Sequence, residues 1–290
     1  MKYLLGFLLL ILSSCQDETI HYNYNQIDPF KNENSTDIKD LEKKNTLKFS
    51  DTQKIKEKCQ QDPNKYIPKD WKKLISIEPP PTNDSKRTRL ELDYLLKLQS
   101  KRTSELIQRI NVEKFFGGWK FGDFFFTELG EHGTDLGCLL YLSLWVSFKF
   151  VFHFKFEFDR VRPSFLENKI IPTINIPPHP AYPSGHATEA YILALVLSEI
   201  DPNKKKSFKN SAFEIAENRV YAGVHYPSDS AAGKILAEKI FDLLLQNEKY
   251  KILLDLGKKN YYSRNLHKKK EFPYPSGERL DSIAVKNNKQ

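Results

Sequence analysis

Cysteines and long apolar segments are both scarce in this chain of 290 residues. Beyond the N-terminus, no segment offers the roughly 20 consecutive apolar residues that a membrane-spanning helix needs. The longest apolar run, residues 136–158, is interrupted by Lys149, His153, Lys155 and Glu157. There is no internal repeat, and no group of Asp, His and Cys residues has convincing metal-ligand spacing. These absences favour one soluble domain with tails, and they predict no metal site.

The N-terminus predicts export. Lys2 precedes the apolar stretch Leu4–Leu12, and Leu12-Ser13-Ser14-Cys15 resembles a bacterial lipobox. A short apolar stretch followed by small residues is typical of a secretory signal rather than of a membrane span. We therefore expect a lipoprotein signal peptide at residues 1–14 and a lipid anchor on Cys15. Such an anchor places the protein in the bacterial cell envelope, facing the periplasm or the surface. An ordinary signal peptide or a short anchor helix is the other interpretation.

The two remaining cysteines, Cys59 and Cys138, would lie in an oxidising compartment, where disulfides form and persist. Spacing along the chain cannot fix the geometry that such a bond requires. Cys138 lies in an apolar stretch, and a buried free thiol is the commoner state of a cysteine in such a place. We therefore favour a free thiol at Cys138 and leave the pairing of the two residues open.

Composition divides the chain into a polar tether at residues 15–65, a domain at 66–250 and a basic tail at 251–290. The tether is rich in Asn, Asp, Lys and Gln and has few apolar residues, as in segments that form no core. The net charge of +8 would suit an anionic partner, but residues 249–290 hold eleven Lys/Arg and four Asp/Glu and so carry +7 of it. A solvated tail explains this excess better than binding to lipid headgroups. We expect no nucleic-acid partner.

Apolar periodicity predicts several helices in the domain. Leucines between Leu90 and Leu98 form a helical stripe that Ser85 or Thr88 can cap. Further helices are expected at about 187–200, 205–221 and 228–247. Residues 136–158 are ambiguous, because their first part matches a buried helix while phenylalanines then alternate up to Phe158 with the period of a strand.

Three short segments in the second half of the chain carry most of the chemistry. They are Lys155-x6-Arg162-Pro163, Pro183-Ser184-Gly185-His186 and Arg219-x5-His225-x3-Asp229. They supply three cations, two histidines, a carboxylate and a glycine turn. A phosphoryl group in transit spreads negative charge over three oxygens, so fixed cations and amide N–H groups can stabilise it. One histidine can attack phosphorus while the other protonates the leaving oxygen.

These segments resemble the three-part signature of the type 2 phosphatidic acid phosphatase superfamily, which is Lys-x6-Arg-Pro, Pro-Ser-Gly-His and Ser-Arg-x5-His-x3-Asp. The superfamily includes membrane lipid phosphatases, soluble bacterial class A acid phosphatases and vanadium haloperoxidases. The chain departs from the signature at Asn218, where serine usually precedes the arginine. The resemblance is specific over about residues 155–235, is nearest to the soluble bacterial members, and implies an all-α helical bundle. It therefore favours helix for residues 136–158.

The resemblance also implies a role for each motif residue. His225 is expected to be the nucleophile, His186 the proton donor to the leaving group, and Asp229 the partner that holds a proton on His225. The residues expected to bind the phosphate are Lys155, Arg162, Ser184, Gly185 and Arg219. Outside the motifs, we interpret His179 as a loop residue rather than a substrate contact, and Arg160 as a solvated surface charge. Asp159 and Glu157 lie between the assigned cations and are not expected to bind metal.

The function that the motifs favour is hydrolysis of phosphomonoesters through a phosphohistidine, without a metal cofactor. A vanadium-dependent haloperoxidase would use the same residues, with vanadate as its cofactor, because the motifs alone do not separate the two activities. A third possibility is a non-catalytic envelope lipoprotein on a decayed enzyme scaffold. Small soluble phosphomonoesters are the expected substrates. Contact with the membrane is expected only through the N-terminal lipid anchor, and the oligomeric state stays open.

Overall fold

Helix α9 (Gly185–Ile200) lies at the centre of a bundle and packs against α7 (Asp135–Phe158), α10 (Lys205–Tyr221) and α11 (Pro227–Leu245). The computed structural model describes residues 63–113 and 134–265, and every regular element within them is a helix. The predicted all-α fold is therefore confirmed. Most side chains of α9 are buried, including those of Ala190, Leu193 and Leu197. A helix that is apolar on all sides is stable only when neighbours enclose it, and this requirement places α9 in the core.

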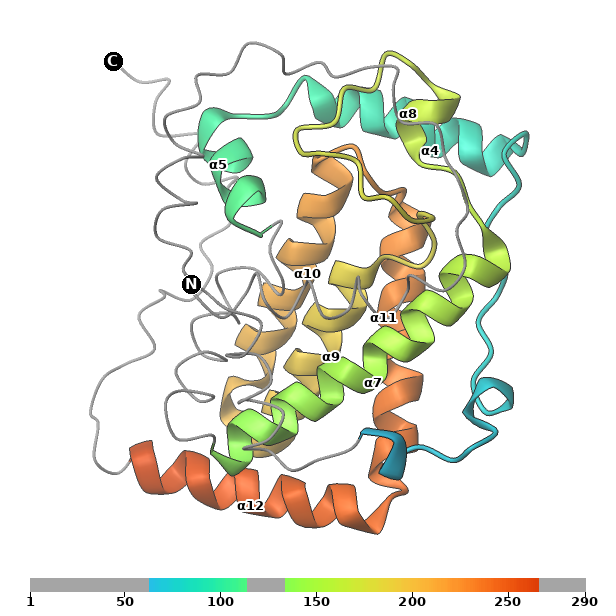
Figure 1. Cartoon of the computed structure of the whole chain (residues 1–290). Coiled ribbons are helices and arrows are strands. Elements are labelled where there is room, and N and C mark those ends of the chain that lie inside the picture. Colours follow the sequence, from blue (N-terminus) through green and yellow to red (C-terminus); the bar gives the residue numbers. More distant parts are fainter. Residues whose placement is uncertain (1–62, 114–133, 266–290) are drawn as a thin grey trace, which may run out of the picture. The chain divides into compact units, whose positions relative to one another are not determined.

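The remaining helices cover the two ends of this core (Figure 1). Helix α12 (Glu248–Asn265) crosses one end, where it packs against α7 and α9. Helices α4 (Lys86–Gln99) and α5 (Ser104–Glu113) lie at the other end, against α10. Short helix α8 (Pro163–Leu166) and the loop that follows it also lie at the α4 end. Two 3-10 turns, η1 (Pro63–Lys65) and η2 (Trp71–Lys73), precede α4, and a third, η3 (Pro202–Lys204), joins α9 to α10.

The ambiguous segment is one long helix, α7. Its alternating phenylalanines fall into two sets at the i, i+4 spacing of a helix face. Phe148, Phe152 and Phe156 stack along one face at centroid spacings of 6.1 Å, while Phe150 and Phe154 are buried in the core. The helix is favoured over a strand because it buries one set of phenylalanines and stacks the other set along its opposite side. Among the described residues this is the helix with the length and hydropathy of a membrane span, but 72% of its most apolar window is buried inside the bundle, as in a core helix.

Local signals in the sequence set several helix boundaries. Ser85 caps α4 by accepting a hydrogen bond from the Thr88 N–H, which decides between the two predicted caps. Asp159 ends α7 in the left-handed conformation, with φ 44°, and its N–H bonds to the Lys155 carbonyl. Gly223 has φ +76° just after α10, a conformation that glycine adopts at little cost. Each turn lies just before a motif residue, Arg162 after Asp159 and His225 after Gly223.

Two expectations need correction. Helix α12 continues the bundle beyond residue 250, with Leu253, Leu254 and Tyr261 buried, so residues 251–265 are not part of a tail. Cys138, for which a free thiol was favoured, is buried and disulfide-bonded. The apolar sequence around Cys138 does not show which distant cysteine can reach it. The other two cysteines lie outside the described residues, as do the predicted signal peptide, the lipidation site Cys15 and most of the tether.

Candidate active site

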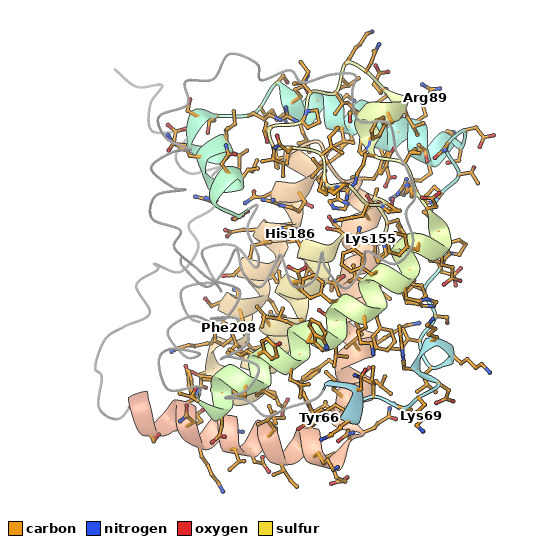
Figure 2. The ribbon with its side chains drawn as sticks, in the orientation of Figure 1. Tyr66, Lys69, Arg89, Lys155, His186 and Phe208 are labelled. Carbon is orange, nitrogen blue, oxygen red and sulfur yellow. The ribbon has the colours of Figure 1, made fainter. Side chains whose placement is uncertain are left out.

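The three motif segments meet at the ends of four helices. Lys155 is in the last turn of α7, Ser184 is the N-cap of α9, and His186 follows in its first turn. Arg219 is in the last turn of α10, while Asp229 is in the first turn of α11. Arg162 precedes α8, and His225 lies between α10 and α11. Figure 2 shows Lys155 and His186 at a similar level of the bundle, while Tyr66 and Phe208 lie nearer α12.

The hydrogen bonds of His225 define its tautomer. Its Nδ1 lies 3.0 Å from Oδ2 of Asp229, and its Nε2 lies 3.0 Å from Nη1 of Arg162. A guanidinium can only donate, so Nε2 must accept and must carry the lone pair. The proton therefore resides on Nδ1 and is donated to the carboxylate. This is the tautomer that a histidine needs in order to attack an electrophile through Nε2.

The surroundings of His225 also keep it neutral. The ring is buried, and burial together with the positive charges of Arg162 and Lys155 holds the pKa of His225 well below its ordinary value. Protonated His186 acts in the same direction. A neutral imidazole is nucleophilic, whereas an imidazolium is not. His225 therefore keeps its lone pair at acidic pH, where an isolated histidine would already be protonated.

Backbone carbonyls hold Arg162 and Lys155 in place. Arg162 donates to the carbonyl oxygens of Val224, at 2.8 Å, and of His179, at 3.0 Å. The Lys155 ammonium donates to the carbonyl oxygens of Pro180, at 2.7 Å, and Ala181, at 3.1 Å. None of these partners is a carboxylate, so they fix the cations without neutralising them. Burial and the nearby charge of Arg162 lower the pKa of Lys155 well below its ordinary value.

His179 is closer to this cluster than its interpretation as a loop residue suggested. Its Nδ1 lies 3.1 Å from Nη2 of Arg162, and its ring packs edge-on against Phe152 at a centroid distance of 5.3 Å. Burial and the charges of Lys155 and Arg162 lower the pKa of His179 well below its ordinary value. His179 therefore positions Arg162 through both its ring and its carbonyl oxygen.

Arg219 is almost fully buried, with a relative exposure of 1%. Its Nη2 donates to Glu113 on α5, at 3.1 Å, and to the Ile110 carbonyl, at 3.3 Å. Its Nε and Nη1 have no hydrogen-bond partner within the described parts of the chain. Buried donors without a partner are costly, and this makes Arg219 a candidate for binding an anion. Burial lowers the pKa of Arg219, and Glu113 opposes this effect.

Asn218 gives the departure from the family signature a structural explanation. Its amide donates to both carboxylate oxygens of Glu113, at 3.0 and 2.8 Å. Glu113 in turn holds Arg219. Serine has a single hydroxyl donor, whereas the asparagine amide has two hydrogens that reach both oxygens of one carboxylate. Asn218 therefore orients Glu113, which is the partner of the phosphate-binding candidate Arg219.

The N-terminus of α9 brings backbone N–H groups to the same place. The Ser184 hydroxyl accepts from the Ala187 N–H, and the Ser184 N–H donates to the Asp229 carbonyl at 3.0 Å. A Cβ at Gly233 on α11 would lie 2.8 Å from the Ser184 carbonyl oxygen, so glycine is needed there for the close approach of the two helices. At Gly185 a Cβ would make only ordinary contacts of 3.6 Å with protein atoms. The partial positive charge at the start of a helix favours an anion.

Residues 136–251 match the model of the PAP2 superfamily. The resemblance expected from the three motifs is thus confirmed. Non-specific acid phosphatases of Providencia stuartii and Salmonella typhimurium are 33% and 34% identical to this chain over 81 and 98 residues. These alignments cover 28% and 32% of this chain, and 33% and 38% of the two relatives. The chain therefore spans about a third of the length of the curated relatives that it matches.

Two solved structures show a partial likeness to the bundle. A bacterial vanadium-dependent iodoperoxidase has a TM-score of 0.48 and 19% identity, over 58% of this chain and 52% of that one. A transmembrane PAP2-type phosphatidylglycerolphosphate phosphatase from Bacillus subtilis has a TM-score of 0.41 and 22% identity, over 56% of this chain and 87% of that one.

Within the PAP2 region, the interpretation of Arg160 as a solvated charge is wrong. Its side chain is 2% exposed and donates to Oδ1 of Asp229 at 2.6 Å and to Oε2 of Glu91 at 3.2 Å. The guanidinium also lies 3.8 Å from the ring centroid of Tyr226. The prediction failed because the sequence around Arg160 does not reveal that Glu91, on α4, covers it. By contrast, Glu157 is half exposed and lies 3.4 Å from His153.

Glu189 is a second buried residue of the PAP2 region that the motifs did not single out. It lies one turn after Gly185 on α9, and its Oε1 lies 3.6 Å from the position of a Cβ on that glycine. Burial raises the pKa of Glu189 to about 7, and the positive charges of Lys155 and Arg219 oppose this. The site therefore includes a carboxyl group that titrates near neutrality beside the cations. The available signal was a glutamate directly before the apolar run at residues 190–197 of α9.

Proposed function

We propose that this protein hydrolyses phosphomonoesters through a phosphohistidine intermediate on His225, without a metal ion. The observation that carries this proposal is the set of cations around Nε2 of His225, together with the two unpartnered donors of Arg219 among the described residues. A tetrahedral dianion suits this arrangement, because forked guanidinium donors match phosphate oxygens. The sequence similarity to non-specific acid phosphatases supports the same reaction class.

In the first step, the phosphate group of the substrate binds between Lys155, Arg162, Arg219 and the N-terminus of α9. Nε2 of His225 attacks phosphorus, a P–N bond forms, and the P–O bond to the leaving group breaks. His186 gives its proton to the leaving oxygen. The cations stabilise the charge on the three equatorial oxygens during the transfer. Asp229 accepts the Nδ1–H hydrogen bond throughout and stabilises the positive charge that develops on the ring.

In the second step, water attacks phosphorus while His186, now neutral, accepts a proton from it. The P–N bond breaks, inorganic phosphate forms, and the electron pair returns to Nε2 of His225. His186 is then protonated and ready for the next substrate. Each turnover therefore converts one ester and one water into an alcohol and phosphate, and no redox partner is needed.

A p-nitrophenyl phosphate assay across acid to mildly alkaline pH, with and without EDTA, tests the reaction. We expect EDTA-resistant activity that vanadate inhibits, because vanadate adopts the five-coordinate geometry of phosphoryl transfer. His225→Ala should lose activity by about three orders of magnitude or more, since the covalent route is removed. Acid-labile, base-stable labelling of the wild type in a rapid quench would identify the phosphohistidine. Near-normal turnover by folded His225→Ala would contradict the mechanism.

Two other assays separate this proposal from its rivals. Bromination of monochlorodimedone in the presence of vanadate, peroxide and bromide would indicate a haloperoxidase. Folded protein that neither hydrolyses p-nitrophenyl phosphate nor brominates would indicate a binding protein without catalysis. Circular dichroism of every preparation confirms that an inactive sample is folded, so that absence of activity is a property of the site.

We propose small soluble phosphomonoesters as substrates and a lipid anchor on Cys15 as the only attachment to the membrane. Comparing nucleoside monophosphates and sugar phosphates with phosphatidate in mixed micelles tests the first point. A kcat/KM about tenfold higher for phosphatidate, or about 1.4 kcal/mol of transition-state preference, would overturn it. Metabolic labelling with a clickable fatty acid tests the second point. Equal incorporation in the wild type and in Cys15→Ala would rule out lipidation at this residue.

A further inference from the structure

Arg160 links the proposed catalytic carboxylate to a helix that lies outside the region of the family match. Its Nη1 donates to Oδ1 of Asp229 at 2.6 Å and to the Ser228 hydroxyl at 2.7 Å. Its Nη2 donates to Oε2 of Glu91 at 3.2 Å. Glu91 belongs to α4, whereas Asp229 belongs to α11. One buried guanidinium therefore bridges two carboxylates that are far apart in the sequence.

Glu91 is itself fixed from the α11 side. Its Oε1 accepts from the Ser228 N–H at 2.9 Å, and its Oε2 accepts from the Ser228 hydroxyl at 2.8 Å. Both contacts lie in the first turn of α11, where a negative charge is favoured. The Tyr226 ring supports the other face of the Arg160 guanidinium. The position of Arg160 is therefore determined from three directions.

The two oxygens of Asp229 are divided between two tasks. Oδ2 accepts from Nδ1 of His225 and from the Tyr226 N–H, each at 3.0 Å, while Oδ1 accepts from Arg160. Three donors thus point at one fully buried carboxylate. A proton on this carboxyl would be one more donor among three donors and would find no acceptor among them. The arrangement therefore favours an ionised Asp229.

We propose that Arg160, held by Glu91, is a positioning residue that keeps Asp229 ionised and aligned with His225. Helix α4 is then part of the catalytic unit, because it supplies the residue that holds Arg160. This inference rests on the proposed role of His225 as nucleophile. If Asp229 became protonated, Nδ1 of His225 would lose its acceptor and the proton could move to Nε2. The Nε2–H tautomer cannot attack phosphorus, so the reaction would stop.

The electrostatics of Asp229 support this role at acidic pH. Burial raises the pKa of Asp229, and Arg160 is the strongest influence in the opposite direction, followed by the Tyr226 N–H and Lys155. The titratable and charged groups that interact with Asp229 or with its partner Arg160 are Arg160, Lys155, His225, Tyr182, Tyr226 and Glu91. Without the Arg160 charge, less would oppose the rise that burial causes in the pKa of Asp229. Asp229 would then take up a proton at a higher pH than in the wild type.

The test compares three variants by the pH dependence of kcat/KM. Arg160→Gln should lower kcat about a hundredfold with KM changed by less than about threefold, and should move the acid limb of the profile to higher pH. Glu91→Gln removes the carboxylate that competes for Arg160, so the acid limb should move to lower pH, with kcat reduced by about tenfold or less. Arg160→Lys keeps the charge and should restore part of the activity. A general loosening of the structure would not move the acid limb in opposite directions in Arg160→Gln and Glu91→Gln.

A matched control and a spectroscopic readout complete the test. Arg89→Gln makes the same charge change as Arg160→Gln, on the exposed face of α4 (Figure 2), and should leave the profile unchanged. Nitrogen-15 NMR of histidine-labelled protein reports which ring nitrogen of His225 carries the proton, whether or not the protein turns over substrate. We expect Nδ1–H in the wild type and Nε2–H or a mixture in Arg160→Gln at pH 5.

Several results would overturn the proposal. One is a wild-type tautomer in folded Arg160→Gln, and another is an acid limb that stays in place in both glutamine variants. If Arg160→Gln does not fold, because it removes the buried cation that two carboxylates share, then Glu91→Gln and Arg160→Lys decide the question. An unchanged acid limb in Glu91→Gln would then reject it. Activity retained in His225→Ala would instead contradict the proposed function, which keeps the two failures distinct.

Discussion

The two sides of His225 differ in how their charges are balanced. On the Nε2 side, backbone carbonyls hold Lys155 and Arg162, and Arg219 keeps two donors without a partner in the described part of the chain. On the Nδ1 side, Asp229 accepts from three donors, and Glu91 and Ser228 fix Arg160. The named contacts of Lys155 and Arg162 on the first side are to neutral oxygens, whereas Arg219 is paired with Glu113. The second side is neutralised within the protein.

This difference indicates that the two sides have different tasks. Lys155 and Arg162, which donate to neutral oxygens, retain their field for a ligand, and burial strengthens that field because little water screens it. A paired carboxylate, by contrast, orients a ring and fixes its proton without attracting a ligand. Substitutions on the Nε2 side should therefore weaken phosphate binding and catalysis together. Substitutions on the Nδ1 side should lower the rate while phosphate binding changes little.

The largest effect should come from Asp229→Asn. The amide keeps the shape of the carboxylate but can present an N–H to Nδ1, which favours the wrong tautomer of His225. We expect kcat to fall by about 10³–10⁴, as removal of ionised carboxylates from comparable histidine pairs does. The inhibition constant for inorganic phosphate should change by less than about threefold. A comparable loss of phosphate affinity would show that the two sides do not have separate tasks.

Arg219→Lys should have the next largest effect. Lysine keeps the positive charge beside Glu113. It lacks the Nε and Nη1 donors, which have no hydrogen-bond partner among the described residues. We expect kcat/KM to fall about a hundredfold, or about 2.7 kcal/mol, and the inhibition constant for phosphate to rise in parallel. Arg109→Lys on α5 is a matched control, because Arg109 is 36% exposed and only loosely paired with Glu214 at 3.9 Å. Unaltered phosphate inhibition in Arg219→Lys would exclude a direct contact.

Glu189→Gln should produce a pH-dependent change in stability. The folded-state pKa of about 7 lies above the ordinary value of 4.5. A carboxyl with a raised pKa contributes stability that is present below pH 4.5 and is lost as pH rises to about 7. The free energy of unfolding falls by about 3 kcal/mol over this pH range. Glutamine does not ionise, so Tm of the variant relative to the wild type should increase from pH 4.5 to pH 8.

The same carboxyl should couple phosphate binding to proton uptake. A dianion beside Glu189 raises its pKa further, so binding near pH 7 takes up a proton in the wild type and less of one in Glu189→Gln. Isothermal titration with inorganic phosphate in two buffers of different ionisation enthalpy measures this uptake. Identical uptake in both proteins, or a Tm difference that does not vary with pH, would place Glu189 outside the influence of the bound anion.

The smallest effect should come from Asn218→Ser, which restores the usual residue of the family signature. Serine offers one donor where the asparagine amide reaches both oxygens of Glu113. The loss of one hydrogen bond to a buried carboxylate should cost about 1–3 kcal/mol of stability. Because Arg219 keeps its own contact with Glu113, kcat/KM should stay within about threefold of the wild-type value. Urea denaturation and the phosphatase assay measure the two quantities.

The sequence by itself located most of the central helices and the candidate residues of the proposed site. The periodicity of leucines and the Ser85 cap located α4, and the intervals between motif residues identified His225, Asp229, Arg162, Lys155 and Arg219 as candidates. Such features are local, because caps and i, i+4 spacing depend on neighbours within a few residues. The departure from the family signature at Asn218 was also visible in the sequence, although its hydrogen-bond partner Glu113 was not.

Only the tertiary structure decided burial and pairing. Arg160 and Arg162 are two residues apart, yet one binds carboxylates and the other binds carbonyls and a histidine. Glu91, Glu113 and Glu189 reach the site from three different helices, and none belongs to a motif. A charged side chain is solvated or buried according to what covers it. In this protein the covering residues come from α4 and α5, 69 and 106 positions away in the sequence, where no local pattern could reveal them.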